Sequence, residues 1–521
     1  VPTLIAQSRG DLSFALGYLH GQERFFQMDL LRRNSAGELA ELFGPVAVNH
    51  DKKIRAHQFR KRASRYLSNL SKAQLSILFS YTAGINQGLD DLSLKPFEYF
   101  LLNKPAVPWR PEDTFLVLYS MYMDLQHEFG ERERVLGQLK NNLMPDIYDF
   151  LTPAGSMWDA AIDNSQYQES KLPTSGFDLA PVLNNLSLNE ADFNLFGTPP
   201  EASKGSNSWA IGGQISKTGS AILADDMHLG LGVPNIWYRA SFRYQDQQHK
   251  VRVDGVTLPG TPVMVVGSNH KVAWGFTNSY GDWNDVILLR LNEQGDQYLT
   301  PDGYKPFELE TEVVLVSGAG AESIEIKKTI WGPVIGRNED GTYLALRWVA
   351  HDAQGVNLNI IALEQSQNVE QAIHVANRSG IPAQNFVTAD NKGNIGWTIA
   401  GPMPKKFGAS NSSADGWAIP QDWSQGKLGW RGYLSPNEYP KVINPNQHRL
   451  WTGNSRVVGG KHYEKIGNGG YALGARSQQI RDGLFAQSRF DEDSMFALQQ
   501  DDKAVFLARG HGYLLDNVLS Y

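Results

Sequence analysis

The chain has 521 residues, a formal net charge of −7 and 20% charged residues, a composition typical of folded globular proteins rather than disordered ones. Its densest basic cluster is Arg60-Lys61-Arg62 with Arg65, so we expect no nucleic-acid partner. It contains no cysteine, which excludes disulfides, thiolate catalysis and cysteine metal sites, and no apolar run has the length of a membrane span.

The first third of the chain has the apolar spacing of amphipathic helices. Helical periodicity runs from Asp11 to Phe43, interrupted at Gly37 and Gly44-Pro45, and further helices are predicted over 73–95, 111–140 and 145–151. The periodicity then fades into Pro, Ser, Asn and Gly, which is typical of a linker. We therefore divide the chain into a helical part over 1–165, a linker over 166–205 and a strand-rich part over 206–521.

After Ser206 the pattern changes to the polar and apolar alternation of strands. Strands are predicted over 208–211, 221–224, 235–244, 251–253, 263–266 and 286–291, and a hairpin over 386–397 has its turn at Lys392-Gly393. Helices are expected again near 367–379 and after 491. Helices that precede and follow a long strand-rich body indicate an α+β fold of packed mixed layers.

The junction Gly205-Ser206 opens the strand-rich part and has two interpretations. It can be a polar turn that enters a strand, or a site of self-cleavage. Cleavage there would place a hydroxyl nucleophile and a free α-amine on Ser206. Because an α-amine has an ordinary pKa of about 7.7–8.0, it can serve as a base near neutral pH. These residues alone do not separate the two interpretations.

Several segments match one known family in order and approximate spacing. They are Gly17-Tyr18-Leu19-His20 with Gly37-Glu38-Leu39, Ser206-Asn207-Ser208-Trp209, Leu258-Pro259-Gly260 with Ala273-Trp274-Gly275-Phe276-Thr277-Asn278, and Trp451-Thr452-Gly453-Asn454-Ser455-Arg456. Together they resemble the penicillin acylase (penicillin amidase) family of N-terminal-nucleophile hydrolases. The resemblance implies a four-layer αββα sandwich in which a helical small-subunit portion wraps around a strand-rich large subunit.

The resemblance also implies a self-processing amidohydrolase. The precursor would be cut between Gly205 and Ser206 into an α/β heterodimer, with the linker over 166–205 excised, and would be located in the periplasm or secreted. Ser206 is expected to attack the amide of an N-acyl substrate, of penicillin or N-acyl-homoserine-lactone type, with its own α-amine as base, and to form an acyl-enzyme. The backbone N–H of Asn278 and the side-chain amide of Asn454 are expected to stabilise the oxyanion, although Asn454 by itself also fits a turn.

Two further side chains are expected near Ser206. His228 lies 22 residues after Ser206, where the resemblance implies that it orients and polarises the serine hydroxyl or amine, although a lone histidine is also commonly a structural group. Arg476 would either hold Asn454 in place or meet a substrate carboxylate.

The positions that would line the acyl pocket are Leu125, Leu229 and Val266. All three are aliphatic, whereas the resemblance implies aromatic residues there in enzymes that accept a phenylacetyl group. This difference favours an aliphatic acyl chain.

A structural calcium ion is implied by the segment Gly281-Asp282-Trp283-Asn284-Asp285. Asp282 and Asp285 would be carboxylate ligands with the carbonyl of Asn284 between them, and Glu131 would supply a ligand from the helical part, so that the ion bridges the two subunits. A solvated acidic turn paired with Arg132 or Arg134 explains the same residues.

Three other classes stay open from the sequence. A conventional serine hydrolase would use a Ser-His-Asp triad, but the chain has no Gly-x-Ser-x-Gly. A non-catalytic, secreted binding protein could retain the fold. A metal-dependent amidase could use Asp225, Asp226 and His228, although there is no His-Glu-x-x-His.

Overall fold

A computed structural model of the chain describes residues 1–127, 129–167, 170–173, 205–246, 249–410 and 416–519. Most of the linker predicted over 166–205 lies outside these residues, so its boundaries and its excision stay predictions. Among the described residues, none of the helices combines the length and the apolar composition needed to cross a bilayer.

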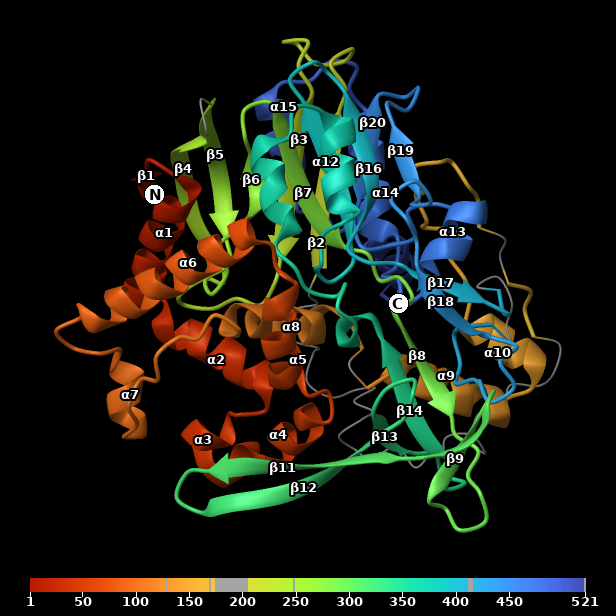
Figure 1. Ribbon diagram of the computed structural model, residues 1–521. Helices are drawn as coiled ribbons and strands as arrows, with labels where there is room; N and C mark the ends of the chain where they lie inside the picture. The colour runs from red at the N-terminus through yellow and green to blue at the C-terminus, as the bar shows by residue number, and fades with distance from the viewer. Residues whose placement is uncertain (128, 168–169, 174–204, 247–248, 411–415, 520–521) are drawn as a thin grey trace.

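The first part of the chain consists of helices, as predicted; in Figure 1 the last two of them lie at the lower right, whereas the others lie on the left and near the centre. They are α1 (Arg9–Glu23), α2 (Phe25–Ala36), α3 (Ala40–Phe43), α4 (Val48–Arg55), α5 (Phe59–Tyr66), α6 (Lys72–Asp90), α7 (Phe97–Leu102), α8 (Asp113–Leu125), α9 (Glu131–Asn142) and α10 (Pro145–Leu151). The predicted interruption at Gly37 is confirmed, because this residue ends α2 with a left-handed φ of 66°.

The largest sheet of the described residues has eight strands in the order β1-β4-β5-β6-β7-β15-β16-β19. The strands are β1 (Thr3–Ile5), β4 (Tyr238–Asp246), β5 (His249–Thr257), β6 (Met264–Ser268), β7 (Val272–Asn278), β15 (Gln384–Asp390), β16 (Ile395–Ala400) and β19 (Lys441–Ile443). β1 pairs with β4 in parallel, while the other pairs are antiparallel. The N-terminal part therefore contributes an edge strand to the sheet of the second part.

A second sheet packs on the first and carries the residues of greatest interest. It has the order β20-β2-β3, with β20 (Arg449–Thr452), β2 (Gly205–Ile211) and β3 (Ile222–His228). β2 and β3 contact β7, while helix α12 (Val369–Ala376) packs on β15 and β16. Helices α14 (Ala475–Phe485) and α15 (Glu492–Gln499) contact β20 and β3 respectively. A mixed α+β fold is thus confirmed.

Smaller sheets extend the molecule away from this core (Figure 1). They comprise β8 (Asn284–Leu288) with β13 (Val334–Arg337) and β14 (Tyr343–Trp348), β9 (Gln297–Thr300) with β10 (Gly303–Pro306), β11 (Glu308–Val316) with β12 (Gly320–Lys328), and β17 (Pro404–Phe407) with β18 (Gly429–Tyr433). The β11–β12 ribbon runs beneath α3 and α4, and β11 contacts both. Helices α13 (Gly460–Ile466) and α16 (Ala508–Asn517) complete the described α-helices and strands.

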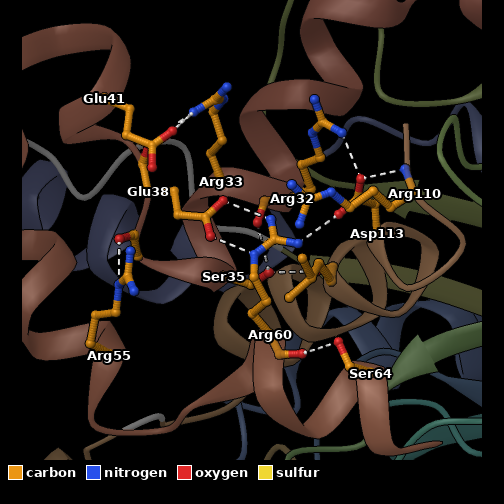
Figure 2. A network of polar contacts seen from close by, with 12 residues as sticks. Arg32, Arg33, Ser35, Glu38, Glu41, Arg55, Arg60, Ser64, Arg110 and Asp113 are labelled. Carbon is orange, nitrogen blue, oxygen red and sulfur yellow. Dashed lines mark hydrogen bonds and ion pairs between the residues drawn. The ribbon is translucent and has the colours of Figure 1, made fainter. Parts of the chain in front are cut away.

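A buried polar network holds the helical part together (Figure 2). Arg32 on α2 contacts Asp113 on α8, with 2.6 Å between Nη1 and Oδ2. The other oxygen of Asp113 accepts from Arg60 on α5 at 3.0 Å, and Arg60 also pairs with Glu38. Since each charge has a partner, the network joins three helices without leaving a buried ion uncompensated.

The hydrophobic cluster around the β20-β2-β3 sheet is rich in tryptophan. Trp209, Trp397 and Trp451 are all buried there. The indole N–H of Trp451 donates to the carbonyl of Ala160 at 2.6 Å, and the N–H of Ile162 donates to the carbonyl of Val457 at 2.8 Å. The end of the helical part is therefore anchored directly behind β20.

Candidate active site

Ser206 lies at the start of β2, where two amide donors converge on its hydroxyl. The backbone N–H of Asn278, the last residue of β7, lies 3.2 Å from Ser206 Oγ. The Nδ2 of Asn454, two residues after β20, also lies 3.2 Å from this oxygen. Three separate segments therefore bring together the three residues that the sequence predicted as nucleophile and oxyanion donors.

The side-chain amide of Asn454 is held in one orientation. Its Oδ1 accepts from the N–H of Ser206 at 2.7 Å and from Arg476 Nη2 at 2.8 Å, and its Nδ2 also donates to the carbonyl of Asn278 at 3.0 Å. The residue is fully buried and has a φ of 69°, a left-handed conformation that asparagine tolerates better than most residues. With both ends of the amide engaged, the NH₂ group faces Ser206.

Arg476 supports this arrangement from α14. Its Nη1 donates to the carbonyl of Ser206 at 3.2 Å and to Asn207 Oδ1 at 2.6 Å. Burial lowers the pKa of Arg476 from its usual value, yet a guanidinium keeps its charge in proteins. Of the two roles predicted for Arg476, the geometry favours the one that positions Asn454.

Gly205 is the residue directly before the serine, and the space around it admits no side chain. A Cβ at this position would lie 2.9 Å from Arg476 Nη2 and 3.1 Å from Asn454 Oδ1. Both atoms are held by their own hydrogen bonds, so a larger residue would disturb the contacts around Ser206.

The imidazole of His228 is not brought to Ser206, contrary to our expectation. β2 and β3 are antiparallel, with Ser206 opposite Met227 and Gly205 opposite His228. Because side chains alternate between the two faces of a sheet, His228 points to the face opposite the serine hydroxyl. There its Nε2 contacts Asp226 Oδ2 at 2.6 Å, and this hydrogen bond lowers the pKa of the Asp226 carboxyl.

The same alternation separates the residues of the alternative metal-dependent amidase. Asp226 and His228 share one face of β3, whereas the Oδ1 of Asp225 lies against Gly275 of β7, between the two sheets. The three side chains therefore do not converge on one point.

An apolar cavity of about 120 Å³ opens beside Ser206. Its lining includes two of the predicted residues, Leu125 and Leu229. Val266 does not line it and its neighbour Val265 does, because successive residues of β6 face opposite sides. The lining also includes residues that the sequence analysis did not identify: Leu118, Met121, Met227, Trp237, Val263, Phe276, Ile360 and Ile381. Engineered cavities of about 150 Å³ bind small apolar molecules such as benzene, so this one fits a small apolar group next to the nucleophile.

Asp282 and Asp285 lie in a compact acidic cluster whose third member is Glu133. Glu131, the predicted ligand, is exposed, and its carboxylate accepts from the N–H of Phe129. Residues two positions apart on an α-helix point in directions that differ by about 200°, so Glu133 rather than Glu131 faces the cluster. Burial raises the pKa of Asp285 to about 7, and the pKa of Glu133 is raised by burial and then by the two aspartates.

The residues around this cluster do not fit the calcium ion that the resemblance implied. The Nζ of Lys406 lies 2.8 Å from Asp282 Oδ2 and 3.0 Å from Asp285 Oδ2. The side-chain amide of Asn284 donates to the carbonyl of His127. A cation of the chain itself therefore occupies the position between the two aspartates.

Curated relatives match nearly the whole of this chain. The chain is 28% identical to acyl-homoserine lactone acylase QuiP of Pseudomonas aeruginosa, over 96% of this chain and 59% of the relative. It is 26% identical to penicillin acylase 2 proenzyme of Pseudomonas sp., over 96% of this chain and 63% of the relative. The chain thus spans about three fifths of the length of these curated relatives.

The fold has a counterpart among solved structures. A thermostable penicillin G acylase from Alcaligenes faecalis superimposes with a TM-score of 0.51 at 21% identity, over 60% of this chain and 56% of that one. The family model described as penicillin amidase matches residues 1–516. A match of this extent, together with the geometry around Ser206, assigns the chain to the penicillin amidase family.

Proposed function

We propose that the chain is a self-processing amidohydrolase that cleaves the amide bond of N-acyl substrates through an acyl-enzyme on Ser206. One observation carries the proposal: the N–H of Asn278 and the NH₂ of Asn454 both donate to Ser206 Oγ beside an apolar cavity. Two preorganised donors are the requirement for stabilising a tetrahedral oxyanion.

Self-processing would begin with attack of Ser206 Oγ on the carbonyl carbon of Gly205. The C–N bond breaks, the hydroxyl proton passes to the nitrogen, and an ester links Gly205 to Ser206. Water then hydrolyses this ester, which leaves a carboxylate on Gly205 and a free amine on Ser206. The 2.7 Å hydrogen bond from the Ser206 N–H to Asn454 Oδ1 supports the proposal, because the same acceptor would hold the new amine.

Substrate hydrolysis follows the same chemistry. The α-amine takes the proton of Oγ through a water molecule as Oγ attacks the acyl carbonyl, and the leaving amine departs with that proton. A second water, deprotonated by the α-amine, hydrolyses the ester and releases the acid. Arg476 keeps Asn454 aimed at the oxyanion in both half-reactions.

The finer architecture belongs to the same proposal. We infer an αββα sandwich built from α12, the large sheet, the β20-β2-β3 sheet and α14 with α15, and a heterodimer of a helical small subunit and a strand-rich large subunit. A periplasmic or secreted location is inferred from the resemblance to the family.

For the acyl group we propose an aliphatic chain. The lining by Leu125, Leu229 and Val265 supports this choice, although Trp237 and Phe276 also contribute to the wall. The relatives named for acyl-homoserine lactones and for penicillins supply the two candidate substrate classes. A hydrolysis panel of phenylacetyl, glutaryl and short and long acyl-homoserine-lactone amides distinguishes them, and preference for phenylacetyl would contradict an aliphatic pocket.

The self-processing step is tested by intact mass. The full-length protein is expected to separate into two fragments with a break between Gly205 and Ser206, and Ser206→Ala is expected to stay uncut and inactive. Ser208→Ala is the matched control, because Ser208 lies on the same strand but its hydroxyl contacts the carbonyl of Ala224. Efficient cleavage of the Ser206→Ala variant at this bond would overturn the proposal.

A further inference from the structure

The cluster of Glu133, Asp282 and Asp285 joins segments that are far apart in the sequence. Glu133 belongs to α9, and its Oε2 accepts from the N–H of Val286 on β8 at 2.8 Å. Asp285 lies on β8, and Lys406 reaches the cluster from β17. A cation that balances the negative charge of this cluster therefore links the helical part to two small sheets.

Lys406 is enclosed as well as paired. Its side chain is 10% exposed, and its Nζ lies 5.0 Å from the ring centroid of Trp417 and 5.7 Å from that of Trp430. Ring faces attract an ammonium at this range. The indole N–H of Trp430 also donates to Asp285, so the aromatic wall and the carboxylate hold each other in place.

A calcium ion and this ammonium exclude one another. Calcium binds carboxylate oxygens at about 2.3–2.6 Å and takes six to eight oxygen ligands. The aspartate oxygens that it would use are the ones paired with Lys406. The NH₂ of Asn284 donates to the carbonyl of His127, and Glu133 Oε2 accepts from the N–H of Val286. The other oxygen of Glu133, Oε1, has no partner among the described residues. One such oxygen is far fewer than the six to eight ligands that calcium takes.

We propose that Lys406 is the resident cation of this cluster and takes the structural place of a divalent metal. The protein is then stable without calcium, and the cluster becomes a calcium site only when the ammonium is removed. This inference concerns the stability of the chain and does not depend on the proposed reaction.

The test compares thermal unfolding of the full-length wild type and Lys406→Met after chelation, with calcium chloride added back. Methionine keeps an unbranched stem between the two indoles and lacks the charge. We expect the Tm of the wild type to stay constant with calcium. Lys406→Met should lose several degrees, since it leaves buried carboxylates without a partner, and calcium should restore at least about 3 °C.

Two controls isolate the charge at this position. Lys405→Met removes the neighbouring lysine, which is 51% exposed and pairs with Glu438, and it should show neither a large loss nor a calcium response. Lys406→Arg keeps a cation and should likewise not respond to calcium. Magnesium chloride at the same concentration serves as the control for general salt effects.

Several outcomes would overturn the proposal. One is a rise in the Tm of the wild type when calcium is added. Another is a wild type that elemental analysis shows to retain about one calcium ion per chain after dialysis. The third is a folded Lys406→Met variant whose Tm does not respond to calcium. If Lys406→Met does not fold, the calcium content of the wild type still decides, because a metal-free, stable wild type supports the proposal and a stoichiometric ion contradicts it.

Discussion

At the scale of single residues, Asn454 links Ser206, the proposed nucleophile, to Asn278 and Arg476. It gives one N–H to Ser206 Oγ and another to the carbonyl of Asn278, while its oxygen accepts from Ser206 and Arg476. The amide is neutral, so in the proposed mechanism it would donate to an oxyanion without shifting the pKa of the α-amine of Ser206 through a charge. Its left-handed backbone at φ 69° lets the side chain turn back toward β2.

Asn454→Ala is expected to reduce turnover by about 10²–10³, the usual cost of losing one oxyanion donor. The effect should fall on kcat more than on KM, because the cavity walls are unchanged. Steady-state kinetics on the processed fraction, quantified by intact mass, measures it. Asn444→Ala is the matched control, since Asn444 also has a positive φ of 46° but bonds to Asn394 and Ile395. Turnover of Asn454→Ala within tenfold of the wild type would contradict the assigned role.

Three residue predictions were shifted by geometry that the sequence does not specify. Which face His228 occupies depends on the register of β2 and β3, and whether Val265 or Val266 faces the cavity depends on the phase of β6. Glu133 replaces Glu131 because α9 begins at Glu131 after a left-handed Gly130. Residue type and spacing located the cavity wall and the acidic cluster to within two positions, but the direction of each side chain required the paired strands and the helix start.

At the scale of elements, α1 and α6 pack unusually closely through glycines on both helices. A Cβ on Gly17 would lie 2.2 Å from the carbonyl oxygen of Tyr81, and one on Gly84 would lie 2.0 Å from that of Phe14. Gly21 and Gly88 make equivalent approaches to Ile85 and Tyr18. These four glycines bring the two helices so close that each backbone contacts the other.

Gly84→Ala is expected to destabilise the protein by about 1–3 kcal/mol, the usual cost of overpacking. On an open helix surface the same change would favour the helix by up to about 1 kcal/mol. Gly510→Ala on α16, where a Cβ meets nothing within 4 Å, is the control for that propensity effect. Urea unfolding of both variants measures the difference, and a Gly84→Ala variant as stable as Gly510→Ala would disprove the close contact.

The elements predicted best were those with a clear period or turn. The hairpin over 386–397 is β15 and β16, and the helix over 145–151 is α10. The single helix expected over 111–140 is broken into α8 and α9, because Gln126 leaves the helical conformation and Gly130 has a φ of 61°. β7 was missed as a strand because nearly all of its residues are buried, so it shows no polar alternation.

At the scale of the whole molecule, a buried histidine pair joins the helical part to the strand-rich part. His57, between α4 and α5, lies 3.0 Å from His351, as measured between Nδ1 and Nε2. The guanidinium of Arg62 donates to the backbone carbonyls of both histidines. Burial lowers the pKa of His57 to about 3 and that of His351 well below its usual value, so the pair is neutral at neutral pH.

The pair is expected to make the folded protein sensitive to acid. Below about pH 6.5 the unfolded chain binds a proton at His57, whereas the folded chain does not until about pH 3. The free energy of unfolding is therefore unaffected by His57 above about pH 6.5, and it decreases as the pH falls from there toward 3. At about pH 5 the loss for one such histidine is about 2 kcal/mol.

His57→Gln removes this titration, so it should lower the slope of unfolding free energy against pH by about 1.4 kcal/mol per unit, or one proton, between about pH 4 and 6. Groups that do not contact His57, including Asp285, contribute equally to both proteins and cancel in the difference. Phe59→Leu is the control, because Phe59 stacks on His57 with 5.1 Å between centroids and its loss destabilises the same junction without a titrating group. Urea unfolding across this pH range measures all three proteins. If both His57→Gln and Phe59→Leu show the wild-type slope of unfolding free energy against pH, the acid sensitivity arises elsewhere in the chain.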